Sequence, residues 1–175
     1  MYTCQLHIYF AGHPSRALDV IKKMPSLKNF THIFSESDEV EASLSQKADA
    51  IIADLSHMEM LPALQTILAN HHAGAQILLL ADKKQMQILC SDPALKNISD
   101  IWIMPMSDEE IRFRFLRWQQ AIQMSRDFWE ASHFLEATID NIPNLVWYKD
   151  KDGVHEKVNN SFCQAVNKTK EQVQG

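Results

Sequence analysis

Glycine is scarce in this sequence, with four residues in a chain of 175. Many nucleotide-binding enzymes hold phosphates on a Gly-rich loop after the first strand, where backbone N–H groups approach the ligand closely. The stretch that follows the first apolar run here, "AGHPSR" at residues 11–16, has one glycine and no lysine. The sequence therefore argues against a small nucleotide-binding enzyme.

Long apolar runs and an excess of basic residues are also missing. No run approaches the roughly 20 residues that a membrane-spanning helix needs, and the N-terminus lacks the order of a signal peptide. The formal net charge is -5 and the pI is about 5.9, with Lys and Arg scattered along the chain. We expect a cytoplasmic protein whose partners include neither nucleic acid nor membrane.

Cysteine is present in an odd number and at wide spacing, as Cys4, Cys90 and Cys163. There is no C-x-x-C pair and no Cys/His cluster with the spacing of a zinc site. Of the eight histidines, only His71 and His72 are adjacent, and neighbours in sequence point to different sides of a helix. We therefore expect reduced thiols, no metal and no cofactor.

What the first part of the chain does contain is an alternation of short apolar runs and amphipathic segments. Such alternation is typical of a parallel sheet with crossover helices, and we predict a five-stranded, doubly wound α/β domain of the receiver or flavodoxin type over residues 1–106. The predicted strands are residues 4–10, 31–36, 49–54, 75–81 and 100–105. The predicted helices are residues 14–24, 38–46, 59–74 and 84–92. Strands 49–54 and 75–81 are almost wholly apolar, which places them in the interior of the sheet.

Asp54 ends the third predicted strand, in "ADAIIADLSHMEMLP". In doubly wound sheets, ligands and reactive groups gather at the carboxyl ends of the strands. An aspartate at this position either performs chemistry there or accepts hydrogen bonds from the turn that follows.

A single long helix is predicted over residues 107–142, which contain no glycine and no proline. It begins with a Ser-x-x-Glu capping box at Ser107 and Glu110. From residue 121 its apolar residues alternate three- and four-residue steps, which is the pattern of a coiled-coil seam. The seam residues are Ala121, Met124, Phe128, Ala131, Leu135, Thr138 and Ile142. They predict a homodimer through paired helices, or else packing of this helix on the next domain of its own chain.

Residues 143–175 change character and predict a hairpin followed by a helix. The turn is expected at Asp152 and Gly153, the helix cap at Asn159 or the next residue, and a core anchor at Phe162. A hairpin with one or two helices cannot bury a core of its own. We therefore expect Gly175 to lie inside a domain.

The five-strand pattern with an aspartate ending the third strand resembles the receiver domain of bacterial response regulators. The resemblance implies a phosphoacceptor at Asp54, with Mg²⁺ only if that residue is phosphorylated. Receivers also carry an acidic pair after the first strand, a hydroxyl residue ending the fourth strand, and a Lys-Pro pair ending the fifth. Here those positions hold Ala11 and Gly12, then Ala81, then Met104 before Pro105. Without the usual cationic partners for phosphoryl transfer, the resemblance implies a degenerate pseudo-receiver in which Asp54 is structural.

Residues 137–175 resemble the opening half of a PAS domain: a lead helix ending in Asn-Ile-Pro, a strand, an Asp-x-x-Gly turn, a second strand ending in Asn, and a helix. The order receiver, helix and PAS resembles the N-terminal region of GGDEF-type diguanylate cyclases or of sensor kinases. This implies a non-enzymatic regulatory segment that controls a downstream output domain, with the cyclase domain favoured, which this sequence does not contain. The alternative is a phosphoaccepting receiver, using Asp54, in a response regulator or hybrid histidine kinase.

Overall fold

The computed structural model describes residues 4–28, 30–91 and 93–174. The chain divides into two compact units, residues 1–120 and residues 121–175, and each is described by itself. Among the described residues, no helix combines the length and the apolar character needed to cross a membrane.

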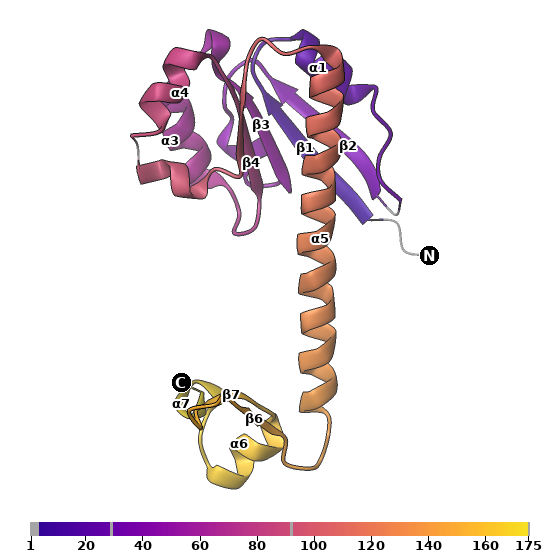
Figure 1. Ribbon diagram of the computed structural model, residues 1–175, viewed down its shortest axis with the longest axis vertical. Coiled ribbons are helices and arrows are strands. Elements are labelled where there is room, and N and C mark those ends of the chain that lie inside the picture. Colours follow the sequence, from indigo (N-terminus) through magenta and orange to yellow (C-terminus); the bar gives the residue numbers. More distant parts are fainter. Residues whose placement is uncertain (1–3, 29, 92, 175) are drawn as a thin grey trace. The chain divides into compact units, whose positions relative to one another are not determined.

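The first unit is built on a five-stranded sheet in which every neighbouring pair is parallel (Figure 1). The strands are β1 (Cys4–Ala11), β2 (Phe30–Ser37), β3 (Ala50–Asp54), β4 (Gln76–Ala81) and β5 (Asp100–Ile103). Their order across the sheet is β2-β1-β3-β4-β5, which is the order of flavodoxin-like folds. The predicted fold class is therefore confirmed.

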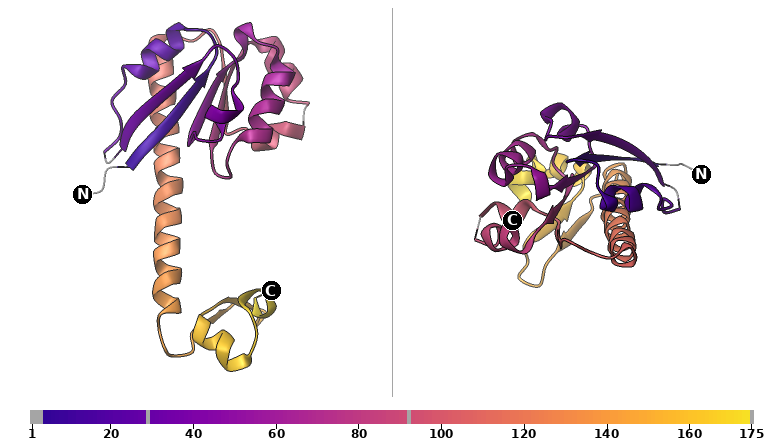
Figure 2. Two further views of the ribbon diagram at one scale, coloured as in Figure 1. Left: turned by 180° about the vertical axis from the view of Figure 1, so that it is seen from behind. Right: turned by 90° about the horizontal axis from the view of Figure 1, so that it is seen from above.

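The sheet is covered by helices on both faces, and this explains why its interior strands read as continuous apolar runs. Figures 1 and 2 show α1 (Arg16–Lys22) and the start of α5 (Asp108–Asp140) along one face, with α3 (Met60–Asn70) and α4 (Lys83–Leu89) on the other. All five residues of β3 are buried, and so are five of the six in β4. The two strands are interior, as predicted.

The helix predicted over residues 38–46 is the main difference, because only α2 (Ala42–Ser45) is helical there. The buried Tyr9 hydroxyl accounts for this. It lies 2.6 Å from Ser37 Oγ, donates to the Glu39 carbonyl at 3.0 Å and accepts from the Glu41 N–H at 2.8 Å. These contacts hold the residues before α2 in a non-helical path.

Smaller differences occur around α3 and α4. A short 3₁₀ helix, η1 (Leu55–His57), follows β3, and another, η2 (Pro93–Asn97), follows α4. Helix α3 ends at Asn70 and not near Gly74, because the next residue, His71, adopts an extended conformation. Gly74 has a φ of 104° and forms part of the turn into β4.

Helix α5 runs for 33 residues from Asp108 to Asp140. The Ser107 hydroxyl oxygen accepts the backbone N–H of Glu110 at 3.2 Å, so the Ser107 half of the predicted capping box is present. The Glu110 side chain pairs instead with Arg114 at 3.3 Å. The helix ends two residues before the predicted limit, because Ile142 precedes Pro143 and a residue before proline disfavours helical geometry. The prediction that Ile142 belongs to the helix is therefore wrong.

The second unit adds a small module after α5. Strands β6 (Trp147–Lys149) and β7 (His155–Val158) form an antiparallel hairpin, followed by α6 (Asn160–Val166) and α7 (Lys170–Val173). Asp150 organises the hairpin turn, because its Oδ1 accepts the N–H groups of Asp152 at 2.9 Å and Val154 at 2.8 Å. Gly153 has a φ of 85°, a conformation that glycine adopts without strain.

Candidate functional site

Asp54 lies at the carboxyl edge of the sheet and is 7% exposed. It is the N-cap of η1, and its Oδ1 accepts two hydrogen bonds from Ser56, one from the backbone N–H at 3.1 Å and one from the hydroxyl at 2.6 Å. One carboxylate oxygen is thus held by the turn that follows β3. This arrangement is that of a strand-end cap.

Gly12 closes the space beside Asp54. It follows β1, has a φ of 140°, and donates its N–H to the Ser37 carbonyl at 2.8 Å. A Cβ atom added to Gly12 would lie 2.8 Å from the Asp54 Cβ, a distance at which backbone or side chain must shift. The position therefore accommodates no carboxylate side chain, and the bare backbone of residue 12 lies directly against Asp54.

The remaining receiver-like positions also lack charged groups. Ala81 is fully buried at the end of β4, and its carbonyl accepts the N–H of Met104 at 2.8 Å. Met104 is half-buried and Pro105 is exposed. A backbone hydrogen bond therefore joins the ends of β4 and β5, and neither residue 81 nor residue 104 has a cationic side chain.

Other acidic residues near this edge already have partners. Asp82 caps α4 by accepting the N–H groups of Lys84 at 2.7 Å and Gln85 at 2.8 Å. The Gln85 side chain in turn donates to the Leu55 carbonyl at 2.7 Å, which ties α4 to the loop after β3. Glu36 pairs with Lys22 at 2.5 Å. Because both carboxylates already have partners, neither is free to act together with Asp54.

A cavity of about 620 Å³ opens on the β2 side of the same edge. Its lining includes His13, Asp38, His57 and Glu59, which follow β1, β2 and β3. His13 Nδ1 lies 3.4 Å from Asp38 Oδ1. The ring centroids of His13 and His57 are 5.8 Å apart. Across the described residues, no three His, Cys, Asp or Glu side chains gather in a way that could hold a metal ion.

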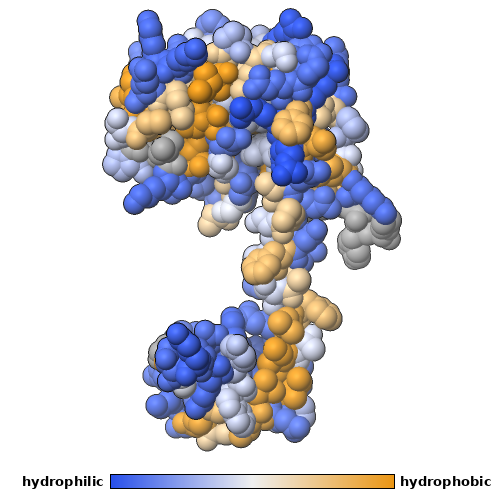
Figure 3. Space-filling model, in the orientation of Figure 1, coloured by the Kyte–Doolittle hydropathy of each residue, from blue (hydrophilic) through white to orange (hydrophobic). Residues whose placement is uncertain are grey.

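The predicted seam of α5 is exposed over its length. Met124 is 72% exposed, Phe128 76% and Leu135 59%, and Figure 3 shows hydrophobic residues along this part of the helix. The Thr138 hydroxyl donates to the Phe134 carbonyl at 2.7 Å, so its polar atom is satisfied within the helix. Ala121 and Ala131 are exposed as well, whereas Ile142 lies in the turn after the helix. Six seam residues thus form an apolar stripe that no described residue covers.

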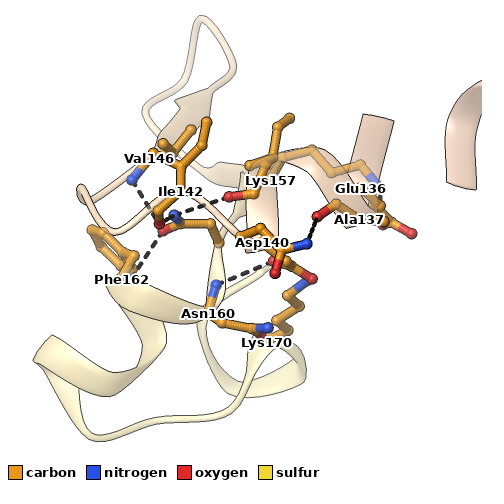
Figure 4. Close-up of polar contacts among 12 residues, drawn as sticks. Glu136, Ala137, Asp140, Ile142, Val146, Lys157, Asn160, Phe162 and Lys170 are labelled. Atoms are coloured by element: carbon orange, nitrogen blue, oxygen red, sulfur yellow. Dashed lines mark hydrogen bonds and ion pairs between the residues drawn. The ribbon is translucent and has the colours of Figure 1, made fainter. Parts of the chain in front are cut away.

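The end of α5 is joined to the hairpin and α6 by a dense polar network (Figure 4). At its centre Asn159, which is fully buried, caps α6 by accepting the Phe162 N–H at 3.0 Å and also accepts the Val146 N–H at 3.0 Å. Its amide nitrogen lies within hydrogen-bond distance of the Ile139, Ile142 and Asn144 carbonyls, at 3.2, 3.1 and 2.9 Å. Phe162, predicted as a core anchor, is half-buried, and its ring centroid lies 5.8 Å from that of Trp147.

Two acidic residues of α5 complete this network. Asp140 accepts the Asn160 N–H at 3.1 Å and pairs with Lys170 at 2.6 Å, and Glu136 pairs with Lys157 at 3.3 Å. These roles were not predicted from the sequence. The position of Asp140 could have indicated its role, because a carboxylate in the last turn of a helix opposes the helix dipole and needs a partner elsewhere.

His32 on β2 packs against aromatic side chains that change its ionisation. Its ring centroid lies 5.8 Å from that of Phe34 and 6.0 Å from that of Phe115 on α5. Burial lowers the pKa of His32 below its usual value near 6.5, and the nearby side chain of Gln119 opposes this to a smaller extent. The neutral imidazole is therefore the form that suits the folded state.

This lowered pKa predicts a pH-dependent stability of the first unit. The unfolded chain binds a proton on His32 more readily than the folded chain, so the free energy of unfolding should fall as the pH drops below about 6.5. Denaturant unfolding between about pH 7.5 and pH 5 would measure this loss. His32→Phe, which keeps an aromatic ring, should lose less stability over that interval; an identical pH dependence in both proteins would contradict the assignment.

No model of a known protein family matches this sequence, and no curated protein matches it. Among solved structures, a pilus assembly protein (CpaE) from Burkholderia thailandensis E264 is 15% identical with a TM-score of 0.47, covering 66% of this chain and 98% of its own. CpaE from Caulobacter crescentus CB15 is 8% identical with a TM-score of 0.45, covering 66% and 92%. The flavodoxin of Streptococcus pneumoniae TIGR4 is 13% identical with a TM-score of 0.45, covering 70% and 99%. These matches concern the fold alone, which the strand order already establishes as receiver-like or flavodoxin-like.

Proposed function

We propose that this chain is a regulatory segment of a bacterial signalling protein, in which a receiver-like domain acts without phosphorylation. The observation that carries the proposal is the contact between Gly12 and Asp54. Phosphoryl transfer to an aspartate needs a metal ion and cationic groups to stabilise the charge that develops. Here backbone occupies the place of the metal-binding carboxylates, Ser56 holds one oxygen of Asp54, and Met104 stands in the place of the lysine.

The rest of the proposal concerns what the segment controls. The resemblance of residues 137–175 to the opening of a PAS domain is supported by the order β6, β7, α6, α7 and by the Asp-x-x-Gly turn. The exposed apolar stripe supports pairing of two α5 helices in a homodimer. We infer that such pairing couples the receiver-like domain to the PAS module and then to an output domain, most simply a GGDEF diguanylate cyclase.

Intact mass after incubation with acetyl phosphate and Mg²⁺ tests the first part. We expect no phosphoryl adduct on the wild-type protein, and therefore the same mass for wild type and Asp54→Ala. A receiver known to accept phosphate from the same solution is the positive control. An adduct that disappears in Asp54→Ala would overturn the proposal and establish the alternative, a phosphoaccepting receiver.

A further inference from the structure

Asp140 is placed against the local preference of its own helix. It is the last residue of α5, and the last turn of that helix contains no basic residue. A carboxylate at a helix C-terminus faces the negative end of the helix dipole, which is unfavourable. Contacts outside the helix must therefore account for an aspartate at this position.

Those contacts use both oxygens of the carboxylate and reach two different elements. Oδ1 accepts the backbone N–H of Asn160, the first residue of α6, at 3.1 Å, and Oδ2 pairs with Lys170, the first residue of α7, at 2.6 Å. The two paired side chains retain 26% and 23% of their exposure. A partly desolvated, short ion pair of this kind is stronger than one in open solvent.

A second ion pair in the same network provides a comparison. Lys157 and Glu136 lie 3.3 Å apart, and their side chains are 67% and 50% exposed. Pairs this exposed contribute little, because water screens them and both side chains lose freedom. Of the two bridges from α5 to the module, only that of Asp140 is short and shielded (Figure 4).

We propose that Asp140 is the coupling residue that makes the last turn of α5 and the pair α6–α7 a single mechanical element. The Asn159 amide fixes the backbone at the helix end, through the carbonyls of Ile139 and Ile142. Asp140 adds side-chain links to the start of each following helix. Any movement of α5 is then passed to the module as a rigid displacement. This inference rests on the proposed function, since it assigns the coupling step to a named contact.

Hydrogen exchange on the full chain, read by mass spectrometry, tests the assignment. In Asp140→Asn we expect amides of residues 137–142 and 160–163 to exchange about tenfold faster than in wild type, because local opening costs less without the ion pair. Lys170→Met should give the same pattern. Glu136→Gln is the matched control, one turn earlier on the same helix, and should change exchange by less than about twofold.

The distribution of faster exchange along the chain distinguishes loss of the Asp140 contacts from a general loss of stability. Faster exchange confined to these two segments and to α7, with β6 and β7 unchanged, supports the proposal. Exchange in Asp140→Asn equal to wild type would overturn it, and so would faster exchange spread equally over the whole second unit. Light scattering on the same samples reports the dimer independently, so a monomeric wild type would count against the proposed function and not against the contact.

Discussion

Asn159→Ala should destabilise the second unit by about 3 kcal/mol, the largest loss of stability that we expect from any single change there. The side chain is fully buried and lies within hydrogen-bond distance of five backbone groups. Alanine would remove the partner of the Val146 N–H, the Phe162 N–H and the Asn144 carbonyl, whereas the carbonyls of Ile139 and Ile142 keep other donors. Polar groups that lose their partner away from water cost more free energy than the hydrogen bonds contribute in net terms. Hydrogen exchange in increasing denaturant, read on peptides from residues 143–174, would measure the difference for this unit alone.

The neighbouring residue supplies the control. Asn160 is exposed, and its contact with Asp140 uses its backbone N–H, which alanine keeps. Asn160→Ala should therefore change the free energy of unfolding by less than about 0.5 kcal/mol. Equal losses of unfolding free energy in the two variants would show that the hydrogen bonds of the Asn159 amide do not stabilise this unit more than an exposed side chain does.

The parallel sheet could be predicted from the sequence because its signals are local. Strands such as 49–54 and 75–81 are buried on both faces, so nearly every residue in them is apolar. The helix predicted over residues 38–46 is too long at its start for the opposite reason, since only Ala42–Ser45 is helical. Its pattern is compatible with a helix, but Tyr9, some 30 residues earlier, captures its first residues with hydrogen bonds. Contacts between residues so distant in sequence leave no local pattern.

The candidate site likewise has features that local sequence predicts and features that depend on contacts distant in sequence. The position of Asp54 at a strand end follows from the apolar run that precedes it, and its role as a cap follows from the polar turn after it. The approach of Gly12 to Asp54 could not be predicted, because it depends on the parallel pairing of β1 with β3 and on a positive φ. The sequence shows that residues 11 and 12 carry no carboxylate, but only the structure shows that the backbone of Gly12 lies directly against Asp54.

The two ends of α5 differ in how they are anchored, and this bears on how a signal would pass. At the start, Arg16 and Asp108 form a 2.6 Å bridge whose side chains are 79% and 25% exposed, and hydrogen bonding to Arg16 lowers the pKa of Asp108. At the other end, a buried amide and a shielded ion pair hold the helix to the module that follows. Between these anchors the six seam residues on α5 are exposed in the part of the chain that the structure describes, and the proposed homodimer would pair here.

A charge placed in that seam should dissociate the proposed homodimer. In Leu135→Asp, pairing would bury a carboxylate among apolar side chains at a cost of about 3 kcal/mol or more, which corresponds to a dissociation constant raised at least about 100-fold. Ala137→Asp is the matched control, because residue 137 is exposed and lies about 200° further around the same helix. Sedimentation equilibrium on the full chain would measure all three proteins.

We expect a dimer for wild type and Ala137→Asp and a monomer for Leu135→Asp at the same concentration. The circular dichroism of Leu135→Asp should keep the helical content of wild type, because its side chain is 59% exposed in the single chain and supports no core there. The proposed pairing of two α5 helices would be contradicted if the wild-type protein remained monomeric. It would also be contradicted if Leu135→Asp dimerised as tightly as wild type. The apolar stripe would then have to be covered by another domain of the same protein, which was the second interpretation that the seam allowed.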